Sequence, residues 1–256
     1  RAAAALIHFG TSFEKRLAAK APTLPPDAMQ APNTLKGEGE CRKILESAGI
    51  PMAGSELART GKEAVSIWKR IKAPVALKIV SSDILHKTEI GGVKLNLNNP
   101  IDIENAFNSI IDAGKTHYPN ADIDGVIVSE MVTDGVETVL GVINDPIFGP
   151  AVMFGLGGVF VEVLGDVTFR LAPFDISEAH RMISEIKGIK MLHGARGAQP
   201  SDINAIAEAL VKLSVFAHEN AEKISSIDIN PFMVKPEGKG AAGVDALIIP
   251  NGVEVN

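Results

Sequence analysis

Residues 74–97 constrain the fold of this chain most, because two segments of alternating side chains flank a loop rich in glycine and lysine. Val75, Leu77 and Ile79 recur at the period of two that a half-buried strand requires, so we expect a strand here. Lys78 then lies on the opposite face from Leu77 and Ile79, where its ammonium can stay in water or meet an anion.

The loop after this strand carries His86, Lys87 and the pair Gly91 and Gly92, and a second alternating strand follows it. Glycines lack Cβ, so their backbone N–H groups can approach a ligand closely. Successive N–H groups beside a lysine are the components of a phosphate cradle. The simpler alternative is a β-hairpin whose glycines form the turn and whose lysines keep it soluble. On this stretch alone, the hairpin is the better interpretation.

Composition narrows the class of protein. The 256 residues fit one large or two medium domains, and 46% hydrophobic and 22% charged residues are ordinary for a globular chain. A net charge of −6 disfavours a nucleic-acid binder. The single cysteine, Cys41, excludes an intrachain disulfide and indicates the cytoplasm. No apolar run approaches the ~20 residues that cross a bilayer, so we expect no membrane partner.

The first half reads as α+β. The alanine-rich residues 1–20 are helix-prone, and a proline-rich stretch follows them. We expect a helix over 40–48, a second opened by the capping box at Thr60, and a third opened by Asn99 with Pro100 at its first position. The unit lacks the repeated βαβ pattern of a doubly wound fold.

The second half opens with two strand patterns, 125–132 and 136–143, separated by a turn signal. We therefore expect Glu130 and Glu137 on adjacent strands, with a wet sheet face as the simpler interpretation. Helices are expected after Asp175 and over 201–219. The sequence contains no dinucleotide fingerprint, P-loop, H-E-x-x-H motif or nucleophile elbow.

Oxygen-bearing side chains gather where strands end near the C-terminus. Asp228 and Asn230 share one face of a strand because Ile227 and Ile229 occupy the other. Together with Asp245 on the next strand but one, they are suited to binding Mg²⁺ beside substrate phosphates. The competing interpretation is an edge strand with a solvated polar face, which is the better one for this feature alone.

Taken together, these segments resemble one family. The segments ALKIVSSDILHKTEIGGVKLNL, VSEMV, GVETVLGV, NDPIFGPAVMFGLGGVFVEVLGDVTFRLAPF, LHGARG and SSIDINPFMV are similar to the ATP-grasp domain of ADP-forming acyl-CoA synthetases. That family is related to the β subunit of succinyl-CoA synthetase. The resemblance covers 35–249 and is most specific over 78–92 and 144–174.

The resemblance implies an α+β ATP-grasp fold, in which two α+β subdomains hold ATP or ADP with Mg²⁺ between them. Lys78 would contact the phosphates, the loop glycines would cover them, residues 130–132 would meet adenine and Glu137 would approach the ribose. The implied nucleotide-binding residues are Lys78, Gly91, Gly92, Glu130, Met131, Val132 and Glu137. The implied metal ligands are Asn230 and Asp245, with Asp228 close behind.

The resemblance also implies a catalytic histidine. In the acetyl-CoA branch of the family, a histidine in the loop matching ILHK carries phosphate towards the nucleotide, so His86 is the candidate. The residues around His86 suit phosphate exchange, but they suit simple exposure equally well.

The family's CoA-binding and ligase domains have no counterpart in this sequence. Residues 1–20 resemble the last helix of an upstream ligase domain and 21–34 resemble a linker, which leaves 35–124 and 125–256 as the two subdomains. A chain that starts at Arg1 also indicates a fragment. We therefore expect upstream domains or an α-type subunit as partner, with CoA and a carboxylic acid bound there.

Two alternatives stay open. The chain could be a nucleotide-sensing ATP-grasp module that regulates a fused protein acyltransferase, or another ATP-grasp ligase that joins a carboxylate to an amine. His86 would have no role in the amine ligase, so detection of phosphohistidine separates that alternative from the synthetase.

Overall fold

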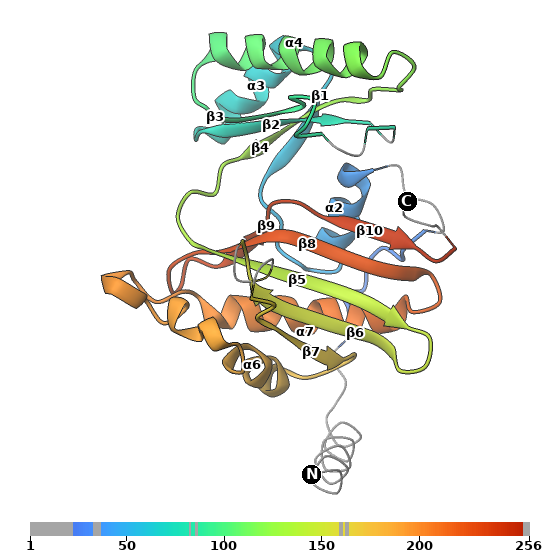
Figure 1. Cartoon of the computed structure of the whole chain (residues 1–256), viewed down its shortest axis with the longest axis vertical. Helices are drawn as coiled ribbons and strands as arrows, with labels where there is room; N and C mark the ends of the chain where they lie inside the picture. The colour runs from blue at the N-terminus through green and yellow to red at the C-terminus, as the bar shows by residue number, and fades with distance from the viewer. Residues whose placement is uncertain are drawn as a thin grey trace, which may run out of the picture.

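The computed structural model describes residues 23–32, 37–81, 83–84, 87–158, 161 and 164–252. The predicted helix at 1–20 and the candidate His86 lie outside these residues. Two antiparallel sheets, each with its own helices, lie one above the other (Figure 1). We call the four-stranded sheet with its helices the small lobe and the six-stranded sheet with its helices the large lobe. Of the helices within the described ranges, none combines the length and apolar character needed to cross a membrane.

The small lobe is a sheet covered on its outer face by two helices (Figure 1). In spatial order its strands are β1 (Ser55–Ala58), β4 (Gly125–Glu130), β2 (Val75–Val80) and β3 (Val93–Leu97). The covering helices are α3 (Gly61–Ile71) and α4 (Pro100–His117). As predicted, Thr60 and Asn99 cap these helices, since their side chains accept the N–H groups of Glu63 and Asp102.

The large lobe surrounds the longer sheet and contains the larger hydrophobic core. In spatial order its strands are β10 (Leu247–Pro250), β8 (Ile224–Val234), β5 (Val136–Asp145), β6 (Gly149–Leu156) and β7 (Val167–Leu171), with β9 (Ala241–Gly243) paired to β8. Its helices are α2 (Glu38–Ser47), α6 (Ile176–Ser184), α7 (Ile203–Glu219) and the 3-10 turns η1 (Lys187–Met191) and η2 (Ala195–Gly197). Leu210 and Leu213 of α7 are fully buried in this core, which accounts for the apolar stripe in the sequence.

Helix α2 lies between the two sheets, beside the edge strand β10 (Figure 1). Cys41, Ile44 and Leu45 of this helix belong to the large-lobe core. The N–H of Ile248 on β10 donates to Cys41 Sγ at 3.4 Å. The helix thereby satisfies one donor of an otherwise open sheet edge.

Two features differ from the sequence prediction. The boundary predicted at 124/125 assigns β4 to the second subdomain, yet β4 lies in the small sheet between β1 and β2. Glu130 and Glu137 are consequently not on adjacent strands, because β5 pairs with β6 and β8 of the other sheet. The short segment between β4 and β5 is therefore a crossing between lobes rather than a hairpin turn. Strand pairing across more than 40 residues decided this arrangement, and local patterns do not report it.

Candidate functional site

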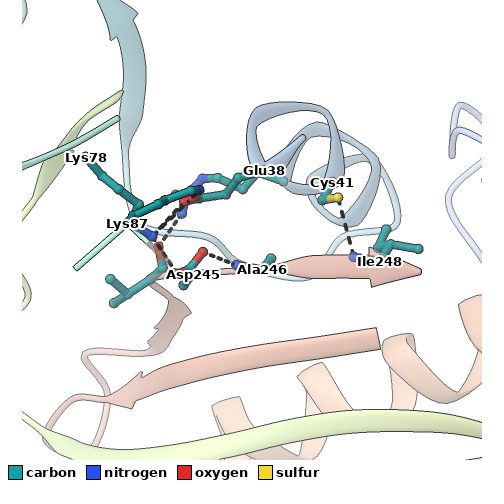
Figure 2. A network of polar contacts seen from close by, with 9 residues as sticks. Glu38, Cys41, Lys78, Lys87, Asp245, Ala246 and Ile248 are labelled. Atoms are coloured by element: carbon teal, nitrogen blue, oxygen red, sulfur yellow. Dashed lines mark hydrogen bonds and ion pairs between the residues drawn. The ribbon is translucent and has the colours of Figure 1, made fainter. Parts of the chain in front are cut away.

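A cluster of two lysines and two acidic residues joins the lobes (Figure 2). Lys78 projects from β2 of the small lobe, and its Nζ lies 2.5 Å from Asp245 Oδ2. The same Nζ lies 3.2 and 3.1 Å from the two carboxylate oxygens of Glu38, the first residue of α2. The small-lobe ammonium and the large-lobe carboxylate that the sequence assigned to one site are therefore in direct contact.

Lys87 brings a second ammonium to the cluster. Its Nζ lies 3.2 Å from Oε2 of Glu38, the oxygen that also contacts Lys78 (Figure 2). The Glu38 side chain is only 5% exposed, whereas those of Lys78 and Lys87 are 20% and 22% exposed. A carboxylate this deeply buried is stable only when cations compensate it, and the two lysines do so.

The pKa values of Asp245 and of its neighbour Asp228 are shifted in opposite directions. Shielding from water raises the pKa of Asp245, but the charge and hydrogen bond of Lys78, together with smaller effects of Glu38 and Lys87, outweigh this and hold the pKa below its usual range. The pKa of Asp228 is raised, first by shielding from water and then by the negative charge of Asp245. Two carboxylates that repel each other beside a lysine favour the arrival of further positive charge.

The C-terminal strands place the predicted metal ligands on one sheet face. The N–H of Asn230 donates to the carbonyl oxygen of Asp245 at 3.2 Å, and Asp228 pairs with Leu247 two residues further along. Side chains two residues apart share a face, so Asp228, Asn230 and Asp245 lie on the same open side. Ile227, on the other face, is buried in the core. The predicted alternation is confirmed.

The oxygen donors of this face suit one kind of divalent-cation site. Within the described ranges, no three or more His, Cys, Asp or Glu side chains converge closely enough to hold a metal ion. Mg²⁺, however, keeps several waters and binds proteins through one or two carboxylates plus substrate phosphates. Asp245 and Asn230, with Asp228 adjacent, supply such a partial set, so these residues fit Mg²⁺ carried by a nucleotide and not an all-protein cage.

Arg42 of α2 holds the backbone next to Asp245 in place. This residue is 2% exposed, and its Nη1 and Nη2 donate to the carbonyl oxygens of Val244, at 2.5 Å, and of Ala53. The pKa of Arg42 is lowered, because the effect of burial outweighs the opposing effect of the nearby Glu38 carboxylate. Because Val244 precedes Asp245 and Ala53 lies on the crossing that leads to β1, Arg42 ties α2 both to the backbone beside Asp245 and to the connection between the lobes.

The predicted glycine pair shapes the loop beside Lys87. The N–H of Gly92 donates to the carbonyl oxygen of Lys87 at 2.8 Å. A Cβ on Gly92 would lie 2.8 Å from that oxygen and from Ile79 Cγ2, which leaves no room for a side chain. Gly91 has φ +74°, in the left-handed region that favours glycine. Both glycines therefore hold the backbone of Lys87 against the end of β2.

Residues 130–132 form one of the crossings between the lobes. Glu130 is opposite Val75 in the β2–β4 register, and its N–H donates to Gly54 O at 3.0 Å. The N–H of Met131 donates to Pro74 O at 2.9 Å. These bonds occupy the amide hydrogens of Glu130 and Met131, so the polar backbone groups that can meet a ligand here are the carbonyls and the N–H of Val132.

Glu137 begins the open face of the large sheet. Its side chain is exposed and its carbonyl oxygen accepts the N–H of Gly157 at 2.8 Å. A Cβ on Gly157 would lie 2.9 Å from Glu137 Cβ, so the glycine-rich segment at the end of β6 permits a close approach to β5. Glu137 and Asp228 thus face the same side of the sheet, on neighbouring strands.

Sequence reasoning missed Glu38 and Arg42, which carry much of the site's geometry. The segment Gly37 to Arg42 resembles the solvated start of an ordinary helix. The available signal was an acidic residue and an arginine four positions apart, on one helix face, a spacing that also suits a surface ion pair. His86 lies outside the described residues, so its role stays a prediction.

Two mixed α+β lobes that meet at a lysine–carboxylate cluster are the arrangement that the sequence predicted. A family model described as an ATP-grasp domain matches residues 27–249, so the chain belongs to the ATP-grasp family. The predicted fold class is confirmed.

Comparison with known proteins identifies the branch. The chain is 41% identical over 215 residues to the β subunit of acetate–CoA ligase [ADP-forming] II of Pyrococcus furiosus, covering 84% of this chain and 91% of that subunit. It is 43% identical over 217 residues to the 4-hydroxybutyrate–CoA ligase [ADP-forming] of Nitrosopumilus maritimus, covering 85% of this chain and 31% of that longer protein. The predicted resemblance to ADP-forming acyl-CoA synthetases is confirmed.

Solved structures agree with this branch. A dinucleotide-forming acetyl-coenzyme A synthetase 1 of Ca. Korarchaeum cryptofilum, in complex with coenzyme A, Ca-AMPCP and HgCl⁺, superposes with a TM-score of 0.79 at 45% identity. The match covers 84% of this chain and 93% of the other chain. Another structure of that enzyme contains coenzyme A and Mg-AMPPCP, with a phosphohistidine segment pointing towards the nucleotide-binding site, and superposes with a TM-score of 0.73 at 41% identity, covering 84% and 93% of the two chains.

Proposed function

We propose that this chain is the nucleotide-binding and phosphoryl-transfer part of an ADP-forming acyl-CoA synthetase. The overall reaction is carboxylic acid + CoA + ATP = acyl-CoA + ADP + phosphate. The contact of 2.5 Å between Lys78 of the small lobe and Asp245 of the large lobe carries the proposal. It supports a single site, between the lobes, for the anionic phosphates and their cation.

In the protein without nucleotide, Lys78 and Asp245 are each other's ion-pair partner. When a nucleotide binds, Lys78 exchanges the half-buried Asp245 for a phosphate oxygen and retains the buried Glu38. Asp245, with Asn230 and Asp228, is then free to hold Mg²⁺. Bound Mg²⁺ would neutralise charge on the phosphate oxygens. The chain's own contribution is to position the phosphates and to exclude water from them.

The crossing at 130–132 would receive the adenine. Since the amide hydrogens of Glu130 and Met131 are engaged within the protein, we assign adenine contacts to the carbonyls of this segment and to the N–H of Val132. Glu137 would then approach the ribose from β5, the large-sheet strand that follows this crossing in the chain. Gly91 and Gly92 would hold the phosphate loop.

Phosphate would move through His86. The P–O bond between the γ-phosphorus and the β-phosphate oxygen of ATP breaks, an N–P bond to the imidazole forms, and ADP leaves with the bonding electrons. In the synthesis of ATP the same step runs in reverse.

The acyl group and CoA would be handled by upstream CoA-binding and ligase domains or by an α-type subunit. We assign residues 1–20 to the end of such an upstream domain and 21–34 to its linker. We also place the protein in the cytoplasm, in accord with its single cysteine.

The test is phosphate labelling of the purified chain. Incubation with [γ-³²P]ATP and Mg²⁺ should give acid-labile, base-stable label, and peptide mapping should place it on His86. His86→Ala should abolish the label, while His117→Ala, an exposed histidine of α4, should leave it intact. Label found only outside His86, or a folded chain that neither binds Mg·ADP nor takes up label, would overturn the proposal.

A further inference from the structure

Lys78 and Lys87 share one carboxylate oxygen. Both ammonium nitrogens lie within hydrogen-bond distance of Glu38 Oε2, at 3.1 and 3.2 Å (Figure 2). An anionic oxygen held between two ammonium groups is the arrangement in which a phosphoryl oxygen is also stabilised. Both lysine side chains are partly open to water, with 20% and 22% of their surface exposed.

When a cation binds, the cluster is left with fewer negative charges than positive ones. Lys78 and Lys87 carry two positive charges, and Glu38 and Asp245 carry two negative charges. Once Asp245 turns to a metal ion, the buried Glu38 alone faces two ammonium groups. One positive charge then lacks an anion, and a phosphate oxygen is the natural replacement.

The position of Lys87 along the small sheet indicates which phosphate it meets. Val75, at the start of β2, is opposite Glu130 of the crossing, and Lys78 is three residues further along the strand, opposite Ile127. At about 3.3 Å per residue, Lys78 lies about 10 Å from the crossing. Lys87 follows the far end of β2, where its carbonyl accepts the N–H of Gly92. The order from the crossing is therefore Lys78 and then Lys87.

We propose that Lys87 is a second phosphate-binding residue, whose ammonium contacts the terminal phosphoryl group of the bound triphosphate while Lys78 contacts the phosphates nearer adenine. This inference rests on the proposed function, because the direction of the nucleotide is set by adenine at the 130–132 crossing. Glu38 is then the buried anion that holds the two ammonium groups in place in both the free and the bound protein.

The experiment compares two ligands on one protein. Calorimetric affinities for Mg·ADP and Mg·AMPPCP, a triphosphate analogue, are measured for wild type, Lys87→Met, Lys87→Arg and Lys78→Met. Lys62→Met, on the outer helix α3, is the control for the loss of one positive charge from the same lobe. Thermal unfolding of each variant verifies the fold.

Lys87→Met should weaken Mg·AMPPCP binding about tenfold or more, should change Mg·ADP binding by less than about twofold, and should be largely rescued by Lys87→Arg. Lys78→Met should weaken both ligands, and Lys62→Met neither. Equal effects of Lys87→Met on the two ligands, or none on either, would overturn the assignment of Lys87. A folded wild-type chain that binds neither ligand would instead overturn the proposed function, before any lysine variant is compared.

Discussion

The buried carboxylate of Glu38 gives the sharpest test of how the lobes are held together. Glu38→Gln removes its charge while keeping its shape, so three contacts to ammonium groups lose their ionic character. Breaking a fully buried ion pair costs about 3–5 kcal/mol. Here Lys78 keeps Asp245 and both lysines reach water, so we expect the free energy of unfolding to fall by only about 1–2 kcal/mol.

The measurement is urea unfolding at pH 7, followed by circular dichroism, with Glu46→Gln as the matched control. Glu46 lies on the same helix but is exposed, so its neutralisation should change the free energy of unfolding by less than about 0.5 kcal/mol. The slope of the transition should be alike in all three proteins. If Glu38→Gln were as stable as the control, the lysines would not depend on Glu38 and the reasoning from its burial would be wrong.

Three further predictions follow from the same contacts. Arg42→Met should lower the free energy of unfolding by about 3 kcal/mol, because one buried and one part-buried carbonyl lose their charged donor; a urea midpoint like that of wild type would contradict this. Folding lowers the pKa of Asp245, so its carboxylate stabilises the protein fully at pH values above its unfolded-state pKa of about 4. This stabilisation is lost as the pH falls through the lower pKa of the folded state. The stability difference between wild type and Asp245→Asn should thus be largest above about pH 5 and shrink on acidification; a difference that grew in acid would refute the assigned shift. Gly157→Ala should cost about 1–3 kcal/mol through its clash with Glu137, measured by thermal unfolding, and an unchanged transition would show that the strands can separate freely.

Local rules predicted much of this fold. The cap residues Thr60, Asn99 and Asp175 accept the N–H groups that their spacing indicated. The Lys78 segment does form an antiparallel pair with the strand after the loop. These features depend on residues close together in sequence, where side-chain period and hydrogen-bonding chemistry decide the structure.

The remainder depended on distant contacts. Glu38 reads as a surface residue until Lys78, 40 positions later, folds onto it, and Asp245 meets Lys78 across 167 positions. The short strand β1 was not predicted, because its four residues carry little pattern of their own and are held by pairing with β4. The resemblance to a family supplied the long-range information for Lys78 and Asp245, and it pointed to neither Glu38 nor Arg42.

The central claim is that Lys78 and Asp245 serve one site for a nucleotide and its Mg²⁺, and a double-mutant cycle tests it most directly. Calorimetric affinity for Mg·ADP is measured for wild type, Lys78→Met, Asp245→Asn and the double variant. Each single change should weaken binding about tenfold or more, and the double variant should lose clearly less than the two losses combined, since the groups act on the same ligand. Losses that simply add, or single variants that bind as wild type does, would contradict a shared site between the lobes.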